Sequence, residues 1–206
     1  MATSIARRGG SHRLRKQTEG GFTLIEVMVS IVVLMIGLVS LAGVFGLAMA
    51  STQTSQQDMI AKQLANEAME SIFTARNTSQ LTWDDIQNTG STNCPITGAS
   101  SCGIFLSNSQ QIYNAGADGI FGTADDANAG EETLREPGPD GTYGDSDDVM
   151  LPLTGYQRTI LISPVYDSNN NLVSSLRGIN ITVQYSTPRM KLSKSYVLSS
   201  FISQYR

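Results

Sequence analysis

The sequence predicts an α+β fold in which a long N-terminal helix packs on a small antiparallel β-sheet. An uncharged apolar run from Val27 to Ala50 follows a short basic head. Helical periodicity continues beyond this run to about Arg76, and three segments rich in β-branched residues come late in the chain. Because a small sheet needs a layer over its apolar face, the periodic segment is expected to cover it.

The apolar run is long enough to cross a membrane. Its 24 residues would form a helix of roughly 36 Å, against a bilayer core of ~30 Å. Glu26 stands at its start, and a carboxylate at mid-membrane costs about 2.5–3.5 kcal/mol, so Glu26 requires a partner or a function. The basic head carries a net charge of +4, which predicts a cytoplasmic N-terminus.

Gly21-Phe22-Thr23-Leu24-Ile25-Glu26 resembles the processing site of type IV prepilins and type II secretion pseudopilins. The resemblance implies that a prepilin peptidase/N-methyltransferase cuts after Gly21 and methylates Phe22. Glu26 would then occupy the position of the family's glutamate in filament assembly. The implied partners are other pilin subunits and an inner-membrane assembly platform, and the implied location is the inner membrane, then a periplasmic or surface filament.

Two other interpretations of the N-terminus each explain part of the sequence. Ala48-Met49-Ala50 fits the cut of a secretory signal peptide, but the apolar segment exceeds the usual 7–15 residues and has no place for Glu26. A plain transmembrane anchor explains the length of the segment but leaves the Gly-Phe-Thr-Leu-Ile-Glu motif without a role.

An amphipathic helix is predicted to continue from the apolar run. Its apolar arc contains Ile60, Leu64, Ala68 and Ile72. An unbroken helix from Phe22 to about Arg76 would measure roughly 80 Å. The expected organisation is a cleaved leader at 1–21, a transmembrane helix at 22–50, an amphipathic helix at 51–77, a loop region at 78–155 and the sheet at 156–206.

The sheet is predicted from three strands, at 156–166, 176–186 and 191–203, joined by turns at 167–171 and 187–189. In the loop region, Cys94 and Cys102 lie eight positions apart, and the oxidising space beyond the membrane favours a disulfide between them. A metal site at these cysteines is disfavoured, since the only histidine, His12, lies in the leader.

An acidic repeat occupies the loop region. The pattern G-x-D-G-x-(aromatic)-G-x-x-D-D occurs at 116–126, the first copy, and at 138–148, the second copy. Residues 116–148 hold 10 of the 18 acidic residues, and glycines let a backbone fold around a hard cation such as Ca²⁺. The expected ligands are Asp118, Asp125 and Asp126 in the first copy and Asp140, Asp145, Asp147 and Asp148 in the second. A solvated acidic loop is the alternative.

The composition and the motifs of the chain disfavour two classes of function, enzymes and nucleic-acid-binding proteins. The mature chain would have no histidine and contains no nucleophile elbow, P-loop or zinc spacing, so an enzyme is not expected. Loss of the leader changes the formal charge from −4 to −8, which disfavours direct nucleic-acid binding.

The leading prediction is a structural filament subunit, a minor pilin or pseudopilin rather than a major one. The alternatives are a filament-borne calcium-binding adhesion or tip module and a plain membrane-anchored, secreted calcium-binding domain.

Overall fold

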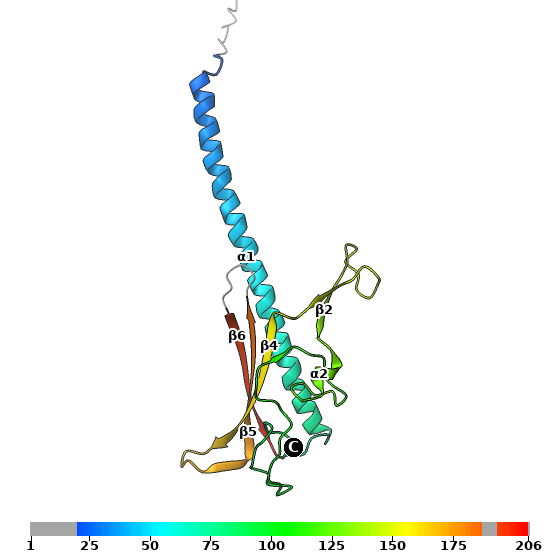
Figure 1. Ribbon diagram of the computed structural model, residues 1–206. Coiled ribbons are helices and arrows are strands. Elements are labelled where there is room, and N and C mark those ends of the chain that lie inside the picture. The colour runs from blue at the N-terminus through cyan, green and yellow to red at the C-terminus, as the bar shows by residue number, and fades with distance from the viewer. Residues whose placement is uncertain (1–19, 187–192, 206) are drawn as a thin grey trace, which may run out of the picture. The chain divides into compact units, whose positions relative to one another are not determined.

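The structure, a computed structural model, describes residues 20–186 and 193–205. The chain divides into two compact units, residues 1–48 and residues 49–206. Helix α1, Leu24–Asn77, runs from the first unit into the second. The predicted α+β class is confirmed by this long helix and the antiparallel sheet described below (Figure 1).

Helix α1 begins just after Thr23, where the Glu26 amide donates hydrogen bonds to the Thr23 carbonyl (3.1 Å) and to the Thr23 hydroxyl (3.3 Å). This N-cap satisfies a donor that the helix leaves free. The helix ends at Asn77, and Ser79 then takes a positive φ of 63°. Both ends therefore have local polar or conformational causes.

The main sheet of the second unit is antiparallel and has the order β1-β4-β5-β6. Its strands are β1 Gln110–Gln111, β4 Tyr156–Tyr166, β5 Leu172–Ser186 and β6 Ser193–Ser203. The bounds of β4 are as predicted. Residues 191 and 192, predicted to begin the last strand, lie outside the described residues.

Strand β5 begins four residues earlier than predicted, at Leu172. The Asp167 carboxylate accepts hydrogen bonds from the amides of Asn169 (2.9 Å) and Asn171 (2.8 Å), and Asn170 has φ 62°. This compact turn reverses the chain completely, so pairing resumes at once between Leu172 and Tyr166. The two-residue strand β1 was not predicted, because so short a segment has no periodicity of its own.

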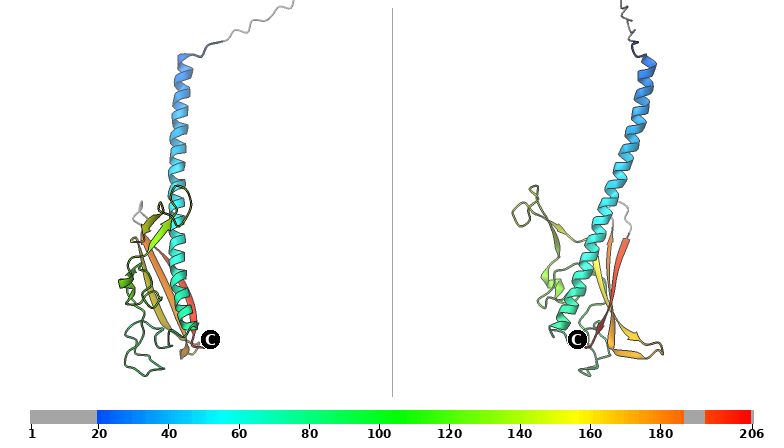
Figure 2. Two further views of the ribbon diagram at one scale, coloured as in Figure 1. Left: turned by 90° about the vertical axis from the view of Figure 1, so that its right-hand side faces the viewer. Right: turned by 180° about the vertical axis from the view of Figure 1, so that it is seen from behind.

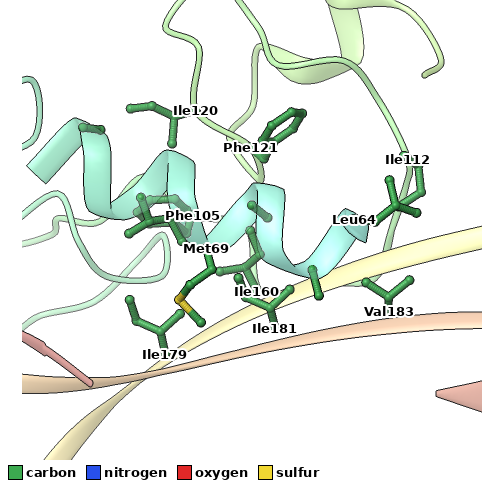
Figure 3. Packing of buried hydrophobic residues seen from close by; sticks show 14 of the residues in the cluster. Leu64, Met69, Phe105, Ile112, Ile120, Phe121, Ile160, Ile179, Ile181 and Val183 are labelled. Atoms are coloured by element: carbon green, nitrogen blue, oxygen red, sulfur yellow. The ribbon is translucent and has the colours of Figure 1, made fainter. Parts of the chain in front are cut away.

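The core lies between the second part of α1 and the sheet. Met69 of α1 points toward the sheet face that carries Ile179, Ile181 and Val183 of β5, and Leu64 lies beside Ile112 (Figure 3). The three β5 side chains are 0% exposed, and burial of each stabilises the fold by about 1.5–3 kcal/mol. The alternation of these residues in the sequence predicts this buried face of β5.

A second apolar layer, formed by residues 105–121, covers the other side of the same helix segment. Ile120 and Phe121 lie across α1 from Ile179 and Ile181 (Figure 3). The helix between Ala61 and Ala75 is therefore covered by the sheet on one side and by this segment on the other. The sequence predicted only the sheet as the partner of the helix.

A separate two-stranded ribbon carries the second copy of the acidic repeat. Its strands, β2 Thr133–Glu136 and β3 Val149–Pro152, pair antiparallel, with Leu134 opposite Leu151. The ribbon extends away from the main sheet (Figures 1 and 2). The region predicted as loop thus contains this hairpin and a short helix, α2 Asp126–Ala129.

Candidate functional site

The N-terminal motif lies where the chain enters helix α1. Residues 20–23 are non-helical and exposed, and the Phe22 side chain is 81% exposed. The Gly21–Phe22 peptide bond therefore lies outside the helix, in an exposed segment. Glu26 lies in the first helical turn, where a carboxylate interacts favourably with the helix dipole.

Helix α1 contains the one described segment long and apolar enough to cross a membrane, judged by length and composition. Its large side chains are exposed in the first unit, for example Val39 (73%) and Leu47 (74%). The Ser30 and Ser40 hydroxyls donate to carbonyls four residues back, at 2.7 and 2.8 Å. These bonds satisfy polar groups that lipid cannot.

The two copies of the acidic repeat begin with the same turn. In the first copy, the Asp118 carboxylate accepts a hydrogen bond from the Ile120 amide at 2.8 Å. In the second copy, Asp140 accepts the corresponding bond from Thr142 at 2.8 Å. The shared sequence pattern therefore specifies a shared local conformation in two different surroundings.

The copies also end alike. Asp126 accepts a hydrogen bond from the Gly122 amide at 2.6 Å, and Asp148 accepts one from Gly144 at 2.7 Å. Both glycines have positive φ, 87° and 101°, a conformation that disfavours side chains. In each copy, the last aspartate therefore closes the loop by binding the turn at the third glycine.

The first glycine of each copy makes room for a carboxylate. A Cβ on Gly116 would lie 2.1 Å from Asp125 Oδ2, and one on Gly138 would lie 2.2 Å from Asp147 Oδ2. Neither contact was predicted. The signal was present, since both copies begin with glycine, but the sequence does not reveal which side chain approaches it.

Each copy gathers three carboxylates. The groups are Asp118, Asp125 and Asp126 in the first copy and Asp140, Asp145 and Asp147 in the second, with one oxygen from each residue within 4.8 Å of the others. Six of the seven predicted ligands therefore lie in two clusters. Asp148 lies outside the second cluster, and its Oδ2 is 3.3 Å from Arg135 Nε on strand β2.

The two clusters differ in environment. Asp126 is 2% exposed, and burial raises its pKa despite hydrogen bonds from the amides of Gly122 and Gly116. In the second cluster, which is exposed, the Asp147 carboxylate raises the pKa of Asp145. A side-chain hydrogen bond between two carboxyl groups is thus the main cause of the raised pKa in the exposed cluster, whereas desolvation is the main cause at Asp126.

One acidic oxygen of the second copy is buried and has no hydrogen-bond partner. The Asp148 side chain is 3% exposed, and its Oδ1 lacks a partner. Buried carboxylate oxygens are normally satisfied, so Oδ1 has capacity for a donor or a cation. The chemistry of both copies suits a hard cation with oxygen ligands.

The disulfide between Cys94 and Cys102 is present, with a Cα–Cα distance of 6.0 Å. Asp84, whose role no sequence pattern indicates, binds the loop that the disulfide closes. Its Oδ2 accepts hydrogen bonds from the Thr97 amide (2.6 Å) and the Thr97 hydroxyl (2.7 Å). Burial acts to raise the pKa of Asp84, but these bonds and the Arg177 charge hold it below its ordinary value.

A family model described as the prokaryotic N-terminal methylation motif matches residues 16–42. The match contains Gly21, Phe22 and Glu26 together with most of the apolar run. No curated protein and no solved structure shows significant similarity to the chain. The chain thus carries a prepilin-type methylation motif at the start of a long apolar helix, and this helix continues into a domain in which it packs on an antiparallel sheet.

Proposed function

We propose that the protein is a minor pilin or pseudopilin, a structural subunit of a type IV pilus or a type II secretion filament. The observation that carries the proposal is the methylation motif at 16–42, placed directly before an apolar helix of membrane-spanning length. In this function the basic leader stays in the cytoplasm. The prepilin peptidase cuts after Gly21, and the assembly platform draws the mature chain from the inner membrane into a filament.

Processing is the direct test. In wild-type cells, N-terminal mass analysis of the membrane-extracted protein is expected to find methylated Phe22. Gly21→Leu should leave the 206-residue precursor in the membrane, because a bulky side chain blocks the peptidase at the residue before the cut. Gly20→Leu, one residue further from the cut, is the matched control and should still be processed. A mature chain starting at Ser51 would instead support the signal-peptide interpretation.

A second candidate function is calcium binding by the acidic repeat, either to stabilise the subunit or to support adhesion at a filament tip. The two carboxylate clusters, the room made by Gly116 and Gly138, and the unpartnered Asp148 oxygen favour it. Asp118, Asp125 and Asp126 would hold one ion, and Asp140, Asp145 and Asp147 the other. Asp148 lies outside the second cluster, so its unpartnered Oδ1 would join the second ion only if the side chain moved. Backbone carbonyls would complete each shell.

Calcium-dependent stability tests this second function. One site should raise the free energy of unfolding by about 2.7 kcal/mol at a hundredfold excess of calcium over the dissociation constant. Thermal unfolding of the detergent-solubilised chain is compared in millimolar calcium, magnesium and chelator. Asp125→Ala with Asp147→Ala should remove most of the calcium effect. Glu70→Ala with Glu131→Ala, which removes two acids outside the copies, should retain it.

A further inference from the structure

A cavity of about 310 Å³ lies in the second unit between the loop 87–93 and strands β4 and β5. Amide and hydroxyl side chains line it, among them Asn88, Ser163 and Ser174, together with the apolar side chains Ile162 and Leu176. Its volume is at the lower end of the range for small-ligand sites. The cavity lies outside both the methylation motif and the acidic repeat.

The one charged residue that lines this cavity is Arg177 of strand β5, which is 5% exposed. Its Nη1 donates hydrogen bonds to the carbonyls of Trp83 and Ile86, the latter at 2.9 Å. Its guanidinium carbon lies 4.2 Å from the centre of the Trp83 ring. Its Nη2, by contrast, is buried and has no hydrogen-bond partner.

The charge of Arg177 also lacks an ion-pair partner among the described residues. Asp84 is the acidic group that acts on it electrostatically, but no carboxylate oxygen of the described residues lies within 4.0 Å of it. The Asp84 oxygens are already engaged by the amides of Ile96 and Thr97. Burial lowers the pKa of Arg177 to about 10, so the side chain remains charged at neutral pH.

A buried arginine is normally paired, because a desolvated charge and an unsatisfied N–H group both cost free energy. The contact with the Trp83 ring supplies attraction to the charge but no acceptor for the Nη2 hydrogens. A carboxylate supplies both a negative charge and oxygen acceptors in the planar geometry that guanidinium prefers. Because Nη2 is buried, a carboxylate in the cavity can accept a hydrogen bond from it only when the side chains that cover Nη2 move aside.

We propose that the cavity bounded by loop 87–93 and strands β4 and β5 binds a carboxylate group, with Arg177 Nη2 as its main donor. The carboxylate belongs either to a small free acid or to a polypeptide, as a C-terminus or an acidic side chain. The inference is independent of the filament role, since it uses no residue of the methylation motif.

Trp83 is the only tryptophan in the chain and contacts the guanidinium, so its fluorescence reports on the site directly. The full-length protein in detergent is titrated with acetate and with N-acetyl-alanyl-alanine, at constant ionic strength set by chloride. A saturable change in Trp83 emission is expected with at least one of them. Saturation by both indicates a site open to small acids, whereas saturation by the peptide alone indicates a polypeptide ligand. The control is the same peptide with its C-terminal carboxylate replaced by an amide. The proposal would be overturned if neither acid gave a saturable change, or if the amide gave a change equal to that of the peptide.

Two variants place the response at the cavity. Arg177→Lys should weaken binding at least tenfold, because lysine lacks the planar pair of donors. Arg177 also supports the Trp83 and Ile86 carbonyls, so the second variant, Thr89→Glu, leaves Arg177 in place and puts a carboxylate at the cavity wall. Thr89→Glu should abolish the response, while Gln157→Glu, an exposed site outside this cavity, should preserve it. A wild-type response from Thr89→Glu would contradict the proposal.

Discussion

At the scale of single residues, glycine in this protein makes space as well as turns. Gly116 does not have a positive φ, so glycine is needed at this position for a steric reason. The Asp125 carboxylate occupies the volume that a side chain at position 116 would fill. Asp125 is held there by the Thr123 hydroxyl at 2.6 Å and, more weakly, by the Asp118 amide at 3.4 Å. The Thr123 bond is the main cause of the low pKa of Asp125, which therefore stays ionised at neutral pH.

Gly116→Ala is accordingly expected to destabilise the protein by about 1–3 kcal/mol, the usual cost of overpacking, and to weaken any calcium response of the first copy. Gly155→Ala is the matched control, because a Cβ there meets no atom within 4 Å and φ is not positive. Thermal unfolding in chelator and in calcium measures both effects. Equal melting temperatures for the two variants would show that the Asp125 carboxylate moves away from the added methyl group without loss of stability.

At the scale of elements, a buried arginine of strand β4 interacts electrostatically with carboxylates of helix α1 and of the start of the ribbon. Arg158 of β4 is 4% exposed and interacts electrostatically with Glu132, Asp126 and Glu67. Burial, and then the Glu67 carboxylate, raise the pKa of Glu132 to about 7. Glu132 Oε2 is buried without a partner, which agrees with an unfavourable charge at this position.

This raised pKa predicts a pH dependence of stability. The folded state binds the Glu132 proton more tightly than the unfolded state, whose pKa is near 4.5. The stabilisation is therefore complete below about pH 4.5 and is lost as pH rises to about 7. At pH 8, Glu132→Gln should have a higher melting temperature than wild type and a free energy of unfolding larger by about 1 kcal/mol, after allowance for solvent screening. The difference between the two proteins should shrink toward pH 5.

The exposed neighbour Glu131 provides the control for this experiment. Glu131→Gln makes the same chemical change one residue away and should show the pH profile of the wild type. Thermal unfolding between pH 5 and pH 8 distinguishes the variants. If Glu132→Gln parallels wild type across this range, burial and Glu67 do not raise the pKa of Glu132 as proposed.

At the scale of the whole molecule, we expect filament assembly to depend on Glu26 in the apolar helix. A carboxylate in lipid needs a positive partner, and the methylated Phe22 amine of a neighbouring subunit is the simplest one. In a low-dielectric setting the attraction of such a pair would largely offset its desolvation, so we expect the pair to contribute more to subunit register than to net affinity.

Glu26→Ala is therefore expected to leave cleavage at Gly21 largely intact and to prevent stable entry into filaments. The measurement is the fraction of the protein in sheared surface filaments compared with the membrane fraction. Ser30→Ala, one helical turn further on, is the control and should enter filaments normally. Incorporation of Glu26→Ala at the wild-type level would exclude the proposed pairing.

Much of the architecture follows from local sequence patterns. The apolar run, the helical period through Ile72 and the alternation along residues 179–185 depend on neighbours in the chain, so they predict α1 and the sheet correctly. The motif around Gly21 and Phe22 is likewise a short continuous signal, and the comparison with the methylation motif agrees with it. The repeat is also a local pattern, and the structure shows that its two copies share the same hydrogen-bonded turns.

Only the tertiary structure decided which distant residues meet. It placed Asp148 beside Arg135, Asp125 against Gly116, and Arg177 against Trp83, which is 94 residues away in the chain. It also covered α1 with a second apolar layer around Ile120. The sequence determines periodicity and composition along the chain, but side-chain pairs across elements depend on how those elements pack, and packing depends on the shape and burial of the whole core.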